Sequence, residues 1–180
     1  MLIQELSIQA SLDLLARTRL GRLACAQGPQ PYVVPCYFVY DANYLYSFST
    51  VGQKILWMRA NPLVCVEVDD VVSPEQWMSV IVLGRYEELP DTPECQGARA
   101  FAHALLKRNA VWWEPAYVKT TLRGAPRPMV PVFYRIEGLQ ITGHRATLDP
   151  VTTPTTGPAM SDSGKAGGLR HLLRQIRGRL

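Results

Sequence analysis

The chain has 180 residues, of which 47% are hydrophobic and 19% charged, and this length suits one well-buried domain rather than two full ones. The net charge of +4 arises in residues 150–180, which hold five of the nineteen Lys and Arg residues but one of the fifteen Asp and Glu residues. The rest of the chain is therefore neutral, which predicts no nucleic-acid or membrane partner for the folded domain. No apolar run approaches the roughly 20 residues that span a bilayer, and the N-terminus lacks the basic start and apolar core of a signal peptide, so we expect a cytoplasmic protein.

Apolar spacing and turn residues predict the secondary structure. The predicted elements are, in chain order, a helix capped by Ser7 that ends near residues 17–20, strands at 21–26, 32–40 and 44–48, a short helix ended by Asn61 and Pro62, a strand at 63–68, a loop at 69–76, a strand at 77–89, a helix from Thr92 to about Asn109 and a strand at 129–142. Six strands at hairpin spacing with few helices between them predict a mainly β protein, namely a six-stranded antiparallel barrel with a few flanking helices.

The stretch from Leu45 to Pro62 carries the strongest functional signal. An apolar strand ends there in a turn rich in Ser, Thr and Gly, after which Gln53 and Lys54 open a short helix. Backbone N–H groups at a helix start, together with hydroxyl groups and one ammonium group, make a phosphate site. The glycine spacing matches no Walker pattern, so an ordinary capped helix stays an alternative.

Pro35 interrupts a strand that would otherwise be central, and because proline lacks the ladder N–H it belongs at an edge or a bulge. One interpretation is a bulge that curves the barrel. The other is that the backbone around Pro35 contacts a flat ligand, beside which the following hairpin brings three more residues. The residues that would line this ligand are Val34, Pro35, Cys36, Tyr37, Ser47, Phe48 and Ser49. An aromatic ring system with a phosphate arm fits both this segment and Lys54.

Trp77 and Ser79 are a further candidate wall, because they share one face of the strand at 77–89. Ser79 is polar among apolar neighbours. It forms a hydrogen bond either to the backbone or to the edge of a ligand ring.

Conventional catalytic signals are few. His103 lies on a predicted helix, His144 lies near the C-terminal tail, and no metal-binding or nucleophile motif occurs. The four cysteines lie in apolar surroundings and we interpret them as small buried hydrophobes, with no metal site expected. An enzyme of this sequence would need a cofactor to carry its reaction.

Residues 146–168 are rich in Thr, Pro, Gly and Ser and predict a low-complexity linker. We therefore expect a folded domain at residues 1–145 and a linker with a basic tail at 146–180. A solvated, disordered end is one interpretation of this tail. In the other, three of its arginines form a basic stripe that touches an acidic membrane or nucleic acid.

Two segments resemble the pyridoxamine 5′-phosphate oxidase-related FMN-binding family, and their pattern is most similar to the branch that includes the nitroimidazole-resistance proteins. They read GRLACAQGPQPYVVPCYFVYDANYLYSFSTVGQKILWMRANPLVCVEVDD at 21–70 and EQWMSVIVLGRYEEL at 75–89. The resemblance covers about residues 5–145. It implies a split β-barrel, a homodimer, and FMN bound in clefts made by both subunits.

The resemblance also implies roles for the candidate residues. The segment from Val34 to Tyr37 would lie along the isoalloxazine ring and ribityl chain, and Ser47, Phe48 and Ser49 would line the ring or the approach to the phosphate. Gln53 and Lys54 would bind the phosphate. Trp77 and Ser79 would lie near the polar edge of the ring. Two departures stand out. Relatives that oxidise pyridoxamine phosphate carry Arg or Lys where this chain has Val34-Pro35-Cys36, and nitroimidazole-resistance relatives often carry a histidine where Phe48 stands.

These departures speak against vitamin B6 chemistry and leave a broader prediction. We expect an FMN-dependent oxidoreductase that acts on a small organic electron acceptor. The alternative is a non-catalytic module that binds or carries a flavin or haem.

Overall fold

The computed structural model describes residues 1–109, 121–122, 125–126 and 130–148. The chain divides into two compact units, Met1–Asp149 and Pro150–Leu180. From residue 149 onward the predicted linker and basic tail lie outside the described residues.

The described residues of the first unit form short and long strands and three helices. They are β1 (Leu2–Glu5), α1 (Ile8–Arg17), β2 (Leu20–Gln27), β3 (Gln30–Tyr37), β4 (Val39–Asp41), β5 (Tyr44–Thr50), α2 (Gln53–Ala60), β6 (Leu63–Ser73), β7 (Gln76–Leu89), α3 (Gln96–Asn109), β8 (Thr121–Leu122), β9 (Ala125–Pro126) and β10 (Pro131–Thr147).

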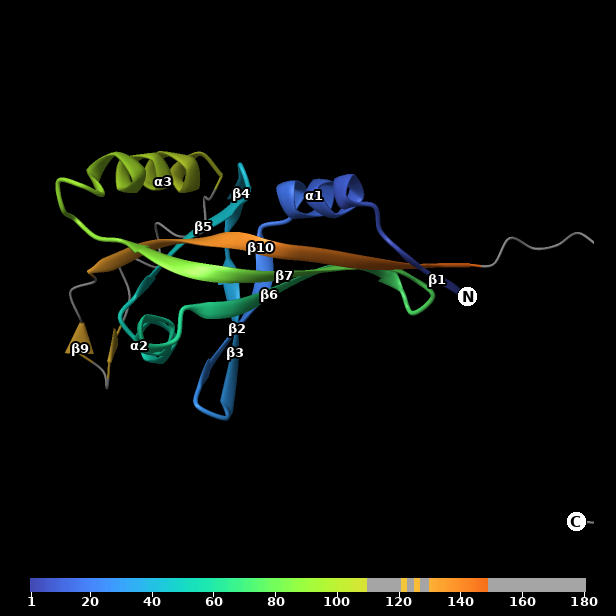
Figure 1. Cartoon of the computed structure of the whole chain (residues 1–180), viewed down its shortest axis with the longest axis horizontal. Coiled ribbons are helices and arrows are strands. Elements are labelled where there is room, and N and C mark those ends of the chain that lie inside the picture. The colour runs from blue at the N-terminus through green and yellow to red at the C-terminus, as the bar shows by residue number, and fades with distance from the viewer. Residues whose placement is uncertain (110–120, 123–124, 127–129, 149–180) are drawn as a thin grey trace, which may run out of the picture. The chain divides into compact units, whose positions relative to one another are not determined.

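Most of these strands form one antiparallel sheet. Its order is β3-β2-β6-β7-β10-β5-β4, with β1 paired to β10, while β8 and β9 make a separate two-stranded ladder. The two outermost strands of the main path, β3 and β4, are separated in the chain by Phe38 alone. The sheet must therefore curl until its ends meet, which is the geometry of a barrel. Figure 1 shows β7 and β10 side by side, with α1 and α3 above them and α2 below.

The mainly β, antiparallel prediction is confirmed, although the strand boundaries differ in places. The predicted strand at 32–40 is two strands, because the N–H of Phe38 bonds to the carbonyl of Arg19 and its ring is buried. Strand β6 runs on to Ser73 where a loop was predicted from residue 69, and β10 continues to Thr147. The last helix begins at Gln96 rather than Thr92, whose carbonyl instead accepts a turn bond from Cys95.

The start of α1 follows the predicted capping. The hydroxyl of Ser7 accepts a hydrogen bond from the N–H of Ala10 at 3.2 Å, which satisfies one of the free donors of the first turn. Leu14 and Leu15 then reach the core on the apolar face of the helix.

Two clusters of buried side chains hold the domain together. The main core lies inside the curled sheet and takes Leu14 and Leu15 from α1 and Ile55 and Met58 from α2. A second cluster lies under α3, around Phe133. No helix in the described part of the chain is long and apolar enough to cross a membrane.

Candidate functional site

The first turn of α2 has the features of an anion site. Its N-cap is Gly52, which supplies no side chain to cap the first amides. Lys54 follows in the same turn and is half-buried. Among the described residues its ammonium makes no hydrogen bond or ion pair. Burial raises the pKa of the Cys25 thiol, and the nearby positive charge of Lys54 opposes that rise. Lys54 is therefore near enough to β2 for its charge to act on Cys25, and no counter-ion pairs with it in the described part of the chain.

Cys36 and Ser47 lie inside the barrel, in contact with each other. The Cys36 sulfur is 3.5 Å from the Ser47 hydroxyl and 3.3 Å from the Tyr134 hydroxyl, and Ser47 donates a hydrogen bond to the carbonyl of Tyr37 at 2.7 Å. Complete burial raises the pKa of Tyr134. Val34 also packs against this core. These predicted ligand-lining side chains face the protein interior.

The other predicted residues of β5 lie on two sides of that strand. Phe48 points toward the second cluster, with its ring centre 5.8 Å from that of Phe133. Ser49 shares the side of Ser47, since side chains alternate along a strand, and it is half-buried opposite Val132. Gln53 is exposed at the start of α2.

Four predicted site residues lie on the side of the sheet turned away from the main core, which we call the outer face. This face is defined by the outward side chains of β2, β6 and β7, namely Arg22, Ala24, Cys65, Glu67, Asp69, Ser79, Ile81 and Leu83. Pro35 is the Cα partner of Arg22 and therefore shares its face. Tyr37 lies two residues after Pro35 on β3, and Trp77 lies two residues before Ser79 on β7, so each points to the same side as that neighbour. As expected for a proline, Pro35 lies on an edge strand of the sheet.

A connected polar cluster occupies the centre of the outer face. Arg22 forms ion pairs with Glu67, at 3.3 Å, and with Asp69. The hydrogen bond and the charge of Asp69 raise the pKa of the Arg22 guanidinium. The hydroxyl of Ser79 donates to the carboxylate of Glu67 at 3.4 Å. Ser79 is thus linked to a side-chain network rather than to backbone.

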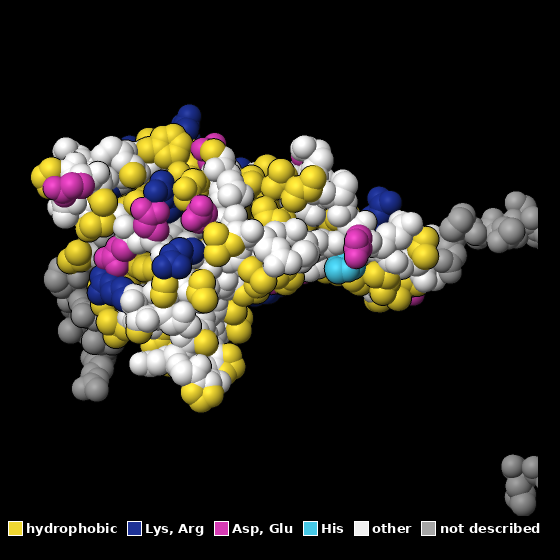
Figure 2. Space-filling view, viewed as in Figure 1, with side chains coloured by type: hydrophobic (Ala, Val, Ile, Leu, Met, Phe, Trp, Pro, Cys, Tyr) yellow, Lys and Arg dark blue, Asp and Glu magenta, His cyan; other side chains and the backbone are white. Residues whose placement is uncertain are grey.

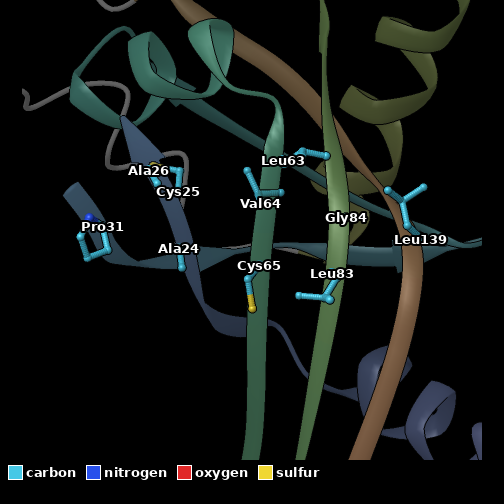
Figure 3. Close-up of a pocket in the computed structure, with 10 residues that line it drawn as sticks. All are labelled: Ala24, Cys25, Ala26, Pro31, Leu63, Val64, Cys65, Leu83, Gly84 and Leu139. Atoms are coloured by element: carbon cyan, nitrogen blue, oxygen red, sulfur yellow. The ribbon is translucent and has the colours of Figure 1, made fainter. Parts of the chain in front are cut away.

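An open apolar hollow of about 450 Å³ adjoins this polar cluster. Figure 3 shows side chains from β2, β3, β6, β7 and β10 around it. Ala24, Cys65 and Leu83 are successive register partners across three strands. Leu83 and Leu139 remain 45% and 58% exposed, which is unusual for leucines gathered on one face. Such a patch is typical of a surface that another molecule covers.

Lys54 and Ser79 have different neighbours in the fold. Cys25, which is near enough to Lys54 for its charge to act on the thiol, belongs to the main core, whereas Ser79 lies on the outer face. Among the described residues no hydrogen bond or ion pair links the predicted phosphate-binding residue to the predicted ring-edge residue.

An ion pair anchors α2 to the sheet. Arg59 makes two hydrogen bonds of 2.7 Å to the carboxylate of Glu88 on β7, which also accepts one of 2.9 Å from the Tyr86 hydroxyl. The Arg59 bond lowers the pKa of Glu88, while burial raises that of Tyr86. This arrangement fixes the helix that carries Lys54.

Sequence reasoning missed three residues of the outer face. Arg22 and Glu67 were not singled out, and His144 was set aside as a residue near the tail. His144 is the Cα partner of Ser79 on β7 and of Glu5 on β1. Alternation along the strands was the available signal, but it needed the strand pairing, which is not local. Among the described residues no group of three His, Cys, Asp or Glu could hold a metal ion.

Comparisons with known proteins agree with the fold. Residues 7–145 match the family described as pyridoxamine 5′-phosphate oxidase. An uncharacterized protein of Rhizobium meliloti (strain 1021) is 38% identical over 146 residues, which are 81% of this chain and 97% of that protein. The crystal structure of a FAD-binding protein from Mesorhizobium loti is 44% identical, with a TM-score of 0.68 over 82% of this chain and 100% of that one.

A more distant structure bears on the predicted branch. The candidate 5-nitroimidazole antibiotic resistance protein from Bacteroides thetaiotaomicron is 19% identical, with a TM-score of 0.58 over 81% of this chain and 89% of that one. At this identity the similarity shows a shared fold alone. The split-barrel prediction is thereby confirmed, and the branch stays open.

Proposed function

Because the chain belongs to the pyridoxamine 5′-phosphate oxidase family, we propose that it binds a flavin nucleotide and acts as a flavin-dependent oxidoreductase on a small organic acceptor. The observation that carries this proposal is the start of α2. There Lys54, a half-buried residue without a counter-ion in the described chain, lies in the first turn of a helix whose amides no side chain caps. A phosphate dianion satisfies both features.

FMN is the specific cofactor that we propose. Its isoalloxazine ring, ribityl chain and phosphate match the groups available, which are Lys54 for the phosphate and Ser79 for a polar ring edge. The similar protein from Mesorhizobium loti is described as FAD-binding, and FAD contains the same ring and ribityl phosphate. The residues of the site therefore fit either nucleotide.

Each set of candidate residues has a distinct part in this proposal. Lys54 and the amides of Gln53 and its neighbours hold the phosphate, and Ser79 hydrogen-bonds the ring edge. Cys36 and Ser47 do not touch the ligand in this proposal, and their contacts inside the barrel hold the backbone of β3 in place. When bound, the flavin would supply the electron transfer, and the chain would orient it and shield it from water.

A homodimer completes the proposed site. Lys54 lies near the core residue Cys25 and Ser79 lies on the outer face, and we propose that a second copy brings the two residues to one ligand. The apolar hollow around Leu83 offers a surface for that copy. We place the flavin where two protomers meet, with the phosphate held by Lys54 of one protomer and the ring near Ser79 on the outer face of its partner.

The absorbance spectrum of the purified protein tests the proposal directly. We expect a flavin spectrum, or its appearance when FMN or FAD is added, and mass spectrometry of the ligand released by denaturation identifies the nucleotide. Protein that stays colourless with both flavins would refute flavin binding. A Soret band would indicate haem instead.

Turnover needs a second experiment. Photoreduced protein is mixed with quinones, nitroaromatic compounds and oxygen, and its reoxidation is compared with that of free reduced FMN. If one acceptor reoxidises the protein faster than it reoxidises free FMN, the result supports an oxidoreductase. If no acceptor does so, the result supports a binding module. A preference for nitroaromatic compounds would support the nitroimidazole-resistance branch. We also propose cytoplasmic residence, which four unpaired cysteines suit because reducing compartments keep thiols free.

A further inference from the structure

His144 occupies a central place on the outer face. Strand pairing puts its Cα directly opposite that of Ser79 on one side and that of Glu5 on the other. Its neighbour Gly143 faces α1, since a Cβ there would lie 2.7 Å from the Ser11 hydroxyl, so His144 points the opposite way. The imidazole is exposed. In Figure 2 a histidine lies beside an acidic side chain over this part of the sheet.

The groups around His144 leave its ring available to a ligand. Ser79 donates to Glu67, and Arg22 pairs with the carboxylates of Glu67 and Asp69. His144 itself makes no hydrogen bond or ion pair with the described residues. It is therefore the one imidazole of the described chain that a molecule on the outer face could contact. The other described histidine, His103, packs with its ring centre 5.7 Å from that of Phe133 under α3.

We propose that His144 is the proton donor of the flavin site, an inference that rests on the proposed function. Histidine is the commonest proton donor in enzymes, and the residues predicted from the sequence to line the ring include no histidine, Asp or Glu. The register partner of His144 is Ser79, the residue assigned to the ring edge. An acceptor stacked on the ring would therefore lie within reach of the imidazole.

The chemistry balances for a quinone as acceptor. A bound reduced flavin would supply the quinone with a hydride, which is two electrons and one proton, and would itself be oxidised. His144 in its protonated state then donates the second proton to the hydroquinone anion. One N–H bond breaks as the O–H bond forms, and the imidazole regains its proton from water.

Nuclear magnetic resonance of histidine-labelled protein tests the location without any turnover. FMN and FAD are added in turn to the flavin-free protein, and the His144→Gln variant assigns the His144 signals. We expect the flavin that binds to shift or broaden the His144 signals and to leave those of His103 in place. Flavin binding with unmoved His144 signals would overturn the inference and leave the proposed function standing.

Reoxidation kinetics test the role. The dissociation constant of His144→Gln for flavin should lie within about twofold of that of the unaltered protein. Its photoreduced form should be reoxidised by a quinone about 100-fold more slowly, which is a typical rate contribution of a general acid. His103→Gln is the matched control and should keep the normal rate. Equal rates in the two variants would remove His144 from the mechanism. Failure of the unaltered protein to bind either flavin would overturn the inference together with the proposed function.

Discussion

The replacement of Lys54 by Met tests the proposed phosphate site most directly. Met keeps the length and most of the apolar stem of the lysine while removing its charge, so the packing of α2 should survive. Ile55 and Met58, which hold this helix in the core, are untouched. Loss of flavin affinity in this variant would then report the ammonium group itself.

The expected size follows from the surroundings of Lys54. A hydrogen bond to a charged group contributes about 1.5–3 kcal/mol, which corresponds to roughly 10- to 150-fold in a dissociation constant. Lys54 is half-buried and lacks a counter-ion among the described residues, so solvent screens it less than a surface lysine. We therefore expect the upper half of that range. The helix amides remain and should retain some affinity.

Fluorescence quenching of added FMN and FAD measures the effect. Lys107→Met on α3 is the control, since it removes the same charge from an exposed position on another element. We expect weaker binding in the first variant and unchanged binding in the second. Equal affinity of Lys54→Met and the unaltered protein, with both folded, would mean that the phosphate is held elsewhere.

Three further predictions concern the sheet. Gly84→Ala should lower the free energy of unfolding by about 1–3 kcal/mol, because its Cβ would lie 2.5 Å from a side chain and 2.6 Å from a carbonyl of β10. Gly97→Ala on α3 meets open space and should stabilise the protein slightly. Thermal denaturation that ranks the two variants in the opposite order would contradict this packing. Arg59 lowers the pKa of Glu88, so the stability that Glu88 adds is present above the ordinary glutamate range and is lost as the pH falls through its lowered pKa. Chemical denaturation should therefore show Glu88→Gln less stable at pH 7, with the difference vanishing in acid; a constant difference would exclude this linkage. Leu83→Lys should turn the proposed dimer into a folded monomer, and a dimer that persists in sedimentation experiments would place the interface elsewhere.

The parts of the fold that depend on local patterns could be predicted from the sequence. Ser7 begins a helix because its hydroxyl and the apolar spacing after it are features of adjacent residues. Strand β1 has no such signal, since all four of its residues are exposed and its strand partner among the described residues is the distant β10. The break at Phe38 also depends on a bond to a residue outside its own strand, the carbonyl of Arg19.

The candidate site shows the same division. Lys54 could be singled out from the sequence because a turn, a lysine and a helix lie together in the chain. The segment at Pro35 was treated as one lining surface, but alternation puts Cys36 in the core and its neighbours on the other side. The pairing of Ser79 with His144 joins residues far apart in the sequence, and only the register reveals it.

The proposal that Lys54 of one protomer and Ser79 of its partner contact the same flavin can be tested with mixed dimers. If each flavin contacts Lys54 of one protomer and Ser79 of its partner, neither Lys54→Met nor Ser79→Leu alone should bind tightly. A mixed dimer of the two variants contains one site with both native residues and one with neither. Refolding a mixture of the variants should therefore restore tight flavin binding to about one site per mixed dimer, as measured by titration. If both residues came from the same protomer, every site would keep one defect and mixing would restore nothing, so an absence of recovery in confirmed mixed dimers would refute the shared site.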